Sequence, residues 1–198
     1  DMFEADALIL HFIVLLEAVQ PEGDTRWSGV LAQGEKVASQ LEVPIIAKEV
    51  GWGFAPKNIR QLIDAGVSAI DVAGAGGTSW SEVEYHRAPT SFHSQVAAAF
   101  ADWGIPTADA LRYAVEAAPD HPIIASGGLR DGIDVAKCVA LGAQLGGMAG
   151  PFLRAAVESV EAVENFTEVV TAQLRIAMLC SGVRTISELK SVPLQRID

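Results

Sequence analysis

The sequence predicts an α/β protein made of consecutive units of a (β/α)8 TIM barrel, and two observations support this fold class. First, five apolar runs of strand length alternate with helical patterns, which is typical of a parallel sheet buried on both faces. Second, all five runs end in glycine or polar residues. A barrel gathers such residues from every strand at one rim, whereas an open sheet concentrates them at a switch point.

The expected elements follow from apolar periodicity and from residues that begin or end helices. The strand runs cover residues 7–12, 43–50, 69–76, 122–128 and 143–150. Helices are expected over about 28–41 (weakened by Gly34), over 56–66 (with Pro56 in the first turn), from Thr107 as N-cap to a point before Pro119, over 131–141 and over about 157–180. Because a barrel needs eight strands, we expect residues 1–198 to be a single domain, the C-terminal portion of a barrel whose N-terminal units are missing.

Charge and hydropathy argue against two classes of partner. The formal charge of −11 disfavours nucleic acid, which requires a basic surface. No window approaches the roughly 18 uninterrupted apolar residues of a membrane helix. Cys138 and Cys180 make neither a metal spacing nor a disulfide framework, and both fall in helical patterns. We therefore expect buried free thiols and a reducing compartment, the cytoplasm.

Glycine-rich sequence after the last two strand runs is the strongest local signal. SGGLRDG (126–132) followed by GGMAGP (146–151) matches the phosphate site that TIM barrels usually carry, where backbone N–H groups and a helix N-terminus favour an anion. The alternative is that these glycines serve only tight turns. Arg130 then either contacts the phosphate or is a solvated charge at the rim.

Two further polar residues follow the central strand runs. Thr78, in GAGGTSW, is placed to bind a phosphate or a flavin ribityl chain. Lys48 interrupts the apolar run IIAKEV and is expected to point into the barrel mouth, where a positive charge commonly stabilises an electron-rich flavin. An ion pair with Glu49 is the alternative interpretation of Lys48.

Other candidates carry less information. His86 and His93 lie in the polar stretch 85–94, which is expected to form a long surface loop with both histidines solvated. Trp52 and Trp80 directly follow strand ends, so each either walls a ligand site or simply packs.

Six motifs in order make the chain resemble type 2 isopentenyl-diphosphate isomerase, an FMN-dependent family. They are HxxxxxEAVQPEGD, VPxxxKEVGxG, AIDVAGAGGTSW, FADWGIPT, IASGGLRDGxDVAK and LGAxLxGMAGPFL, between about Ala5 and Leu189. The resemblance implies a TIM barrel that interconverts isopentenyl and dimethylallyl diphosphate with reduced FMN, with Mg²⁺ on the diphosphate and NAD(P)H as flavin reductant. It also implies a homo-oligomer, a tetramer or larger.

The resemblance also implies roles for individual residues. FMN would be contacted by Lys48, Thr78, Gly127, Gly128, Leu129, Ala149 and Gly150. His11 would bind the substrate, and Glu17 would hold Mg²⁺, which proteins usually bind through one or two carboxylates plus substrate phosphates.

The chain departs from the family at two positions. The family's pattern is His-x-Asn-x-x-Gln-Glu, whereas residues 11–17 read HFIVLLE. Ile13 replaces the asparagine beside the flavin, and Leu16 occupies the catalytic position of the glutamine that handles the substrate proton. A leucine side chain neither donates nor accepts a hydrogen bond, and a general acid–base step contributes about 10²- to 10⁴-fold.

Two alternatives therefore stand beside an active isomerase. One is a catalytically degenerate or truncated remnant that binds FMN or phosphate, or that only associates with other subunits. The other is a different FMN barrel, such as a 2-hydroxy acid oxidase. Those families show an aspartate before the glycine pair and GRP after the last strand, whereas this chain has Ser126 and AGP.

Overall fold

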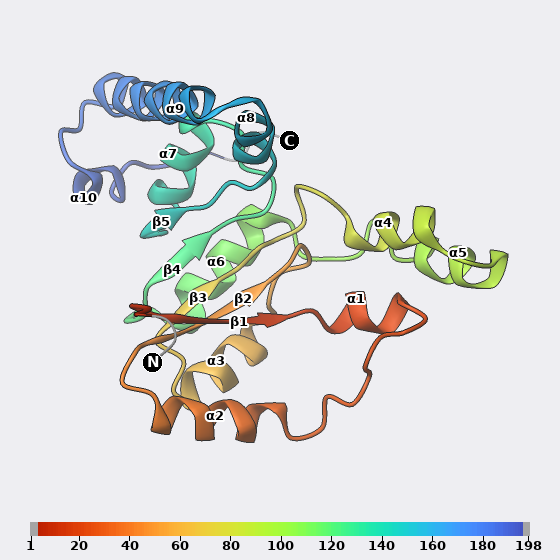
Figure 1. The fold of residues 1–198 in the computed structure, drawn as a ribbon. Helices are drawn as coiled ribbons and strands as arrows, with labels where there is room; N and C mark the ends of the chain where they lie inside the picture. Colours follow the sequence, from red (N-terminus) through yellow and green to blue (C-terminus); the bar gives the residue numbers. More distant parts are fainter. Residues whose placement is uncertain (1–3, 196–198) are drawn as a thin grey trace.

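The computed structural model describes residues 4–195 and contains one sheet of five parallel strands. The strands lie in chain order across the sheet (Figure 1): β1 (Leu8–Phe12), β2 (Ile45–Glu49), β3 (Ala69–Asp71), β4 (Ile123–Ala125) and β5 (Leu145–Gly146). Each strand falls inside a predicted run. Parallel neighbours joined by helices are successive units of a TIM barrel, which confirms the predicted fold class.

Helices connect the strands and follow the last of them. They are α1 (Val14–Val19), α2 (Val30–Gln40), α3 (Pro56–Asp64), α4 (Trp80–Arg87), α5 (Ser91–Ala98), α6 (Thr107–Ala117), α7 (Gly132–Ala140), α8 (Gly150–Glu158), α9 (Val160–Cys180) and α10 (Ile186–Leu189). The predicted helices correspond to α2, α3, α6, α7 and α9. Asp131 explains the start of α7, because its carboxylate accepts hydrogen bonds from the N–H groups of Ile133 and Asp134 at 3.0 and 2.8 Å.

Alternating strand residues give the sheet two different faces. The helix-facing side forms the core, in which Ile45, Ala47, Ile70, Ile123 and Ala125 are buried with Ile59, Leu62 and Leu111. On the opposite face, which a barrel turns inward, Ile9 and Leu145 of the outer strands are 49% and 61% exposed. The inward face of the sheet is therefore only partly covered by the described residues.

The region predicted to be a long surface loop, residues 85–94, is instead largely helical, and that prediction is wrong. It contains the end of α4 and the start of α5, which pack on each other and lie near α1 beyond the strand ends (Figure 1). The polar residues there cap and anchor the helices. Thr90 caps α5, with its Oγ1 2.8 Å from His93 Nδ1, and buried Glu84 accepts a hydrogen bond from Gln20 Nε2 at 3.0 Å. His86 is exposed, as expected, whereas His93 is half-buried.

Three other local predictions are corrected. Thr107 is the first residue of α6 rather than its cap, because Pro106 takes the cap position and Thr107 Oγ1 donates to Gly127 O at 2.6 Å. The predicted helix over 157–180 is interrupted at Ser159, which caps α9. Cys138 is buried as expected, but Cys180 is exposed, because α9 packs on α7 and α8 with only part of its surface.

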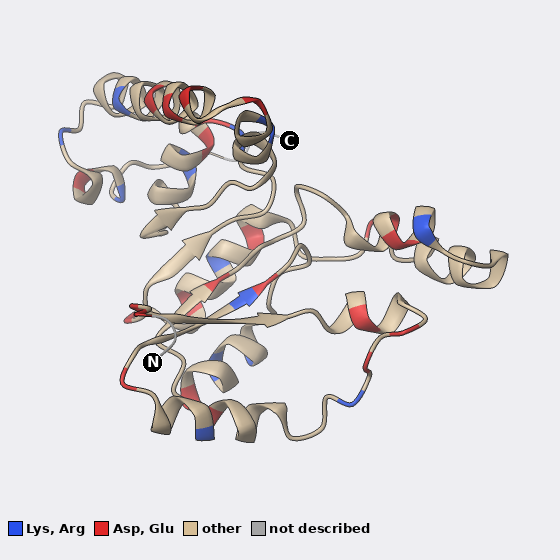
Figure 2. Ribbon diagram, viewed as in Figure 1, with Lys and Arg blue, Asp and Glu red and all other residues tan. Residues whose placement is uncertain are grey.

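Charged residues are distributed over the whole fold. Figure 2 shows Lys and Arg scattered singly among the acidic residues rather than gathered on one element. Within residues 4–195, none of the helices combines the length and the apolar character that crossing a membrane requires.

Candidate functional site

A cavity of about 620 Å³ lies at the carboxyl ends of β2 to β5, and we call it the rim cavity. Its lining includes every residue that the sequence predicted to contact a flavin: Lys48, Thr78, Gly127, Gly128, Leu129, Ala149 and Gly150. Carboxyl ends of parallel strands are where TIM barrels place their sites. The fold thus brings together residues that are about a hundred positions apart in the chain.

The floor of the rim cavity is a polar network from three strands. Lys48 Nζ donates to Glu49 O at 2.8 Å and lies 3.9 Å from Asp71 Oδ2. Asp71 Oδ1 accepts from Ser126 Oγ at 2.6 Å and from the Ala73 N–H at 3.3 Å. The alternative that Lys48 pairs with the Glu49 carboxylate is therefore wrong, since the partner is Asp71. The sequence interpretation missed Asp71, although a carboxylate inside the apolar run AIDVAG is a signal for it.

The glycine pair 127–128 brings two turns together. Both residues have positive φ, +105° and +84°, and a Cβ would lie 2.1 Å from Gly74 O at the first and 1.9 Å from Gly76 O at the second. Any larger residue would push the 126–130 turn off the 74–78 turn. Part of the glycine requirement is thus the close turn packing that the alternative interpretation proposed.

The start of α8 forms the other end of the cavity. A Cβ on Gly150 would meet, within 4 Å, only the flexible tip of Arg154 at 3.6 Å, so the space in front of this helix is open. Arg154 lines the cavity and was not predicted; a basic residue one turn into the helix after the last glycine turn was the available signal. Arg130 also lines it, but its side chain is 79% exposed and pairs with Asp134 at 3.4 Å. Helix N-termini and arginines favour anions, so this end suits a phosphate.

The rim cavity fits a flavin mononucleotide by size and by its groups. Small-molecule sites usually measure about 300–1,000 Å³, and 620 Å³ lies within this range. A cation, Lys48, stands on its floor, and an open helix N-terminus with Arg154 stands at the α8 end. This donor set matches a ligand that combines a polar ring system with a phosphate.

The predicted substrate, catalytic and metal residues do not line the rim cavity. His11 is exposed on β1, in register with Lys48 on β2. Leu16 and Glu17 are half-buried on α1. Glu17 Oε2 accepts a hydrogen bond from the Asp24 N–H at 2.7 Å, which closes the turn that follows α1. Residues 4–195 contain no group of three His, Cys, Asp or Glu side chains arranged to hold a metal.

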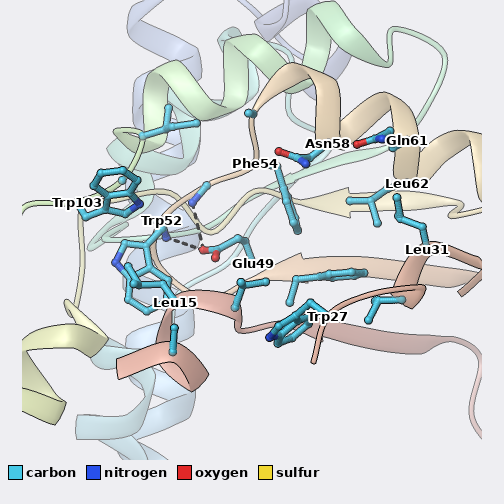
Figure 3. A pocket seen from close by; sticks show the side chains of 18 of the residues that line it. Leu15, Trp27, Leu31, Glu49, Trp52, Phe54, Asn58, Gln61, Leu62 and Trp103 are labelled. Atoms are coloured by element: carbon cyan, nitrogen blue, oxygen red, sulfur yellow. Dashed lines mark hydrogen bonds between the residues drawn. The ribbon is translucent and has the colours of Figure 1, made fainter. Parts of the chain in front are cut away.

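A larger cavity, of about 870 Å³, lies on the helix side of the sheet, and we call it the aromatic cavity (Figure 3). Six aromatic residues line it: Phe12, Trp27, Trp52, Phe54, Phe100 and Trp103. Trp52 thus walls a cavity, but a different one from the predicted site, whereas Trp80 lines the rim cavity. The loop after β2 separates the two spaces, since Val50 and Gly51 line the rim cavity while Trp52 and Gly53 line the aromatic cavity.

Successive parallel βα units with a phosphate-type cavity at the strand ends define a TIM-barrel protein with a nucleotide-cofactor site. The family model described as FMN-dependent dehydrogenase matches residues 21–196, and the chain belongs to this family.

Curated relatives are identical to the chain at about half of the aligned positions. An isopentenyl-diphosphate delta-isomerase of Rickettsia bellii is 49% identical over 195 residues, and one of Nostoc sp. is 51% identical over 199 residues. These matches cover 98% and 100% of this chain but 57% of each relative. The chain therefore spans little more than half the length of the relatives it matches, and the resemblance seen in its motifs is confirmed.

Solved structures share the fold at lower sequence identity. A Pediococcus acidilactici protein described as a lactate oxidase superposes with a TM-score of 0.72 at 22% identity, covering 98% of this chain and 54% of that one. A mandelate oxidase gives 0.60 at 21% identity, with 81% and 41% covered. At this identity the likeness supports the barrel fold alone.

Proposed function

We propose that the natural polypeptide containing this chain is a type 2 isopentenyl-diphosphate isomerase, which interconverts isopentenyl and dimethylallyl diphosphate. The observation that carries the proposal is the rim cavity, in which seven residues of the family's flavin motifs converge at one strand-end rim. The relatives named isopentenyl-diphosphate delta-isomerase, at 49–51% identity, support the same activity.

FMN would be held in the rim cavity and would supply acid–base chemistry in its reduced form. Lys48 would place its ammonium group against the ring system, and Asp71 and Ser126 would fix the position of Lys48 from below. Backbone N–H groups at Gly127 and Gly128 and at the start of α8 would face the phosphate. These groups bind and orient the cofactor and keep water from its ring.

Substrate and metal would bind beside β1 and α1. His11 adjoins Lys48 in register, so a substrate against His11 would also lie near the ring system. Glu17 uses one carboxylate oxygen to accept the Asp24 N–H, and its other oxygen would ligate Mg²⁺ together with the diphosphate. The same proposal includes NAD(P)H as the flavin reductant, a homo-oligomer of four or more subunits and a location in the cytoplasm.

Residues 13 and 16 limit the expected rate. Ile13 occupies the N-cap position of α1 without a side-chain hydrogen bond, a position that asparagine fills well. Leu16 offers no group that moves a proton. These two side chains favour, as a second candidate, a barrel that binds FMN and substrate but turns over slowly or not at all.

Assays of isomerisation and of flavin binding distinguish the active isomerase from the inactive barrel. The natural polypeptide should purify with FMN or take it up, and should convert isopentenyl diphosphate when reduced FMN and Mg²⁺ are present. Flavin uptake without any conversion would favour the inactive barrel, and absence of flavin uptake would contradict both candidates. An oxidase acting on 2-hydroxy acids is disfavoured, because Ser126 replaces the aspartate of those families and donates to Asp71.

A further inference from the structure

Among the described residues that line the aromatic cavity, Glu49 is the single charged one. Figure 3 shows its carboxyl group among the rings of Trp27, Trp52 and Phe54, with Trp103 further along the wall. A cavity of this size lined by aromatic residues with few polar groups has the general character of a small-molecule site. It lies behind the loop after β2, so it is separate from the flavin site proposed above.

Only one oxygen of Glu49 has partners in the described structure. Oε2 accepts four backbone hydrogen bonds, from Val50, Gly51, Trp52 and Gly53, at 2.5 to 3.1 Å. Within residues 4–195, Oε1 accepts no hydrogen bond, and no Lys, Arg or His forms an ion pair with the side chain. Oε2 therefore anchors the loop, while Oε1 is left for another partner.

This carboxyl group is buried without a counter-ion. Glu49 is 7% exposed, and burial raises its pKa, although the four backbone N–H groups lower it in part. The four N–H groups offset part of the cost of burying this carboxylate, and a proton or a nearby positive charge would offset the rest. A cationic ligand would supply that charge, and the net charge of −11 raises the local concentration of cations.

The aromatic lining favours the same kind of ligand. Aromatic rings attract ammonium groups through the negative charge above their faces, most strongly for tryptophan. Three of the six aromatic residues that line the cavity are tryptophans. We propose that the aromatic cavity binds a small organic ammonium ion, with its charge next to Glu49 Oε1 and its apolar part against the aromatic residues. This site is independent of the proposed isomerase activity.

Two probes of equal shape test the proposal. Benzylammonium and benzyl alcohol differ mainly in charge at about pH 7.5, and calorimetric titration of the purified natural polypeptide measures the affinity of each. We expect benzylammonium to bind at least about tenfold more tightly, because only it pairs with Glu49 and gains cation–π attraction. Equal affinities, or no binding of benzylammonium, would overturn the proposal.

Three variants test whether the probes bind in the aromatic cavity. Glu49→Gln removes the charge but keeps an oxygen for the loop N–H groups, so the preference for benzylammonium should fall to the smaller part that the aromatic rings contribute. Ala18→Trp, on the α1 side of the cavity wall, should fill the space and abolish the binding of both. Glu82→Gln, exposed on α4 and outside the lining, is the matched control and should change nothing.

A measurement on the unmodified chain covers the case in which Glu49→Gln fails to fold. Lowering the pH through the raised pKa of Glu49 protonates the carboxylate, so benzylammonium binding should weaken while benzyl alcohol binding stays constant. Benzylammonium affinity that is unchanged by this titration, or by Glu49→Gln or Ala18→Trp, would contradict the assignment.

Discussion

Lys48 Nζ and Asp71 Oδ2 lie 3.9 Å apart on neighbouring strands whose residues are paired in register at these two positions. Their side chains are only 26% and 11% exposed, so water and salt screen this pair less than a surface ion pair. Ser126 Oγ, from the next strand end, donates to the other Asp71 oxygen at 2.6 Å. The pair fixes a cation on the floor of the rim cavity.

Lys48→Ala should weaken FMN binding at least about tenfold, because a charge-assisted contact to the ring system is lost. Flavin fluorescence titration of the natural polypeptide measures the dissociation constant. Lys57→Ala, exposed on α3 and outside the rim cavity, is the control and should leave it unchanged. Equal affinities in the two variants would remove Lys48 from the flavin site.

Gly127→Ala should destabilise the fold by at least about 2 kcal/mol, because alanine resists positive φ and its Cβ would lie 2.1 Å from Gly74 O. Gly34→Ala is the matched control. Gly34 lies within α2, and an added Cβ there would have no neighbour within 4 Å, so alanine should stabilise by about 0.5–1 kcal/mol. Urea unfolding measures both, and a neutral Gly127→Ala would show that the two turns are not closely packed.

The strands could be predicted from the sequence because each apolar run indicates a buried strand and the glycine or polar residues at its end indicate a turn. The helices within residues 85–94 could not be predicted, because polar composition is also typical of a loop. The polar residues in and beside this segment, such as Thr90 and Glu84, instead cap and anchor the helices. Asp71 also interrupts an apolar run, as Lys48 does, but its pairing with Lys48 and Ser126 could not be predicted, because these partners come from other strands. Contacts between residues far apart in the chain produce no recognisable pattern of residue spacing in a single sequence. Lys48 was recognised because it interrupts an apolar run.

Glu49 should make the stability of the chain fall as pH rises. Its pKa in the folded state is raised above the ordinary 4.5, mainly by burial. The folded state therefore binds more protons than the unfolded state between 4.5 and the raised value, and stability falls with pH across that window. Above the raised pKa, the ionised Glu49 carboxylate destabilises the fold by a constant amount.

Glu49→Gln lacks this ionisation and isolates its contribution. The free energy of unfolding of the unmodified chain, minus that of the variant, should become more negative from about pH 4 upward and then level off. Urea unfolding at a series of pH values measures the difference. A difference that is constant with pH, or that grows more positive, would show that Glu49 is not desolvated in the fold.

Glu17→Gln should raise the Mg²⁺ concentration needed for half-maximal isomerisation at least about tenfold, because a neutral amide is a poor ligand for this ion. The amide oxygen can still accept the Asp24 N–H, so thermal stability should be preserved. Glu22→Gln, exposed in the following turn, serves as the control. A large loss of stability in Glu17→Gln would instead mark Glu17 as a structural residue.

Leu16→Gln should raise kcat by about 10²-fold or more, the usual contribution of one positioned proton-transfer group. KM should change little, because His11 and Glu17 remain. Ile13→Asn should add to this and should also cap α1, stabilising it by about 0.5–2 kcal/mol. The two effects need not add, because the residues are close on one segment. Equal rates for all four combinations would show that the chemistry occurs elsewhere.

Turnover of isopentenyl diphosphate tests the central claim most directly. The natural polypeptide and its Leu16→Gln/Ile13→Asn variant are each loaded with reduced FMN and Mg²⁺, and the formation of dimethylallyl diphosphate is followed. We predict slow conversion by the natural polypeptide, faster conversion by the variant, and none by either protein without flavin. Failure of the flavin-loaded variant to form any dimethylallyl diphosphate would contradict the assignment of this barrel as an isopentenyl-diphosphate isomerase.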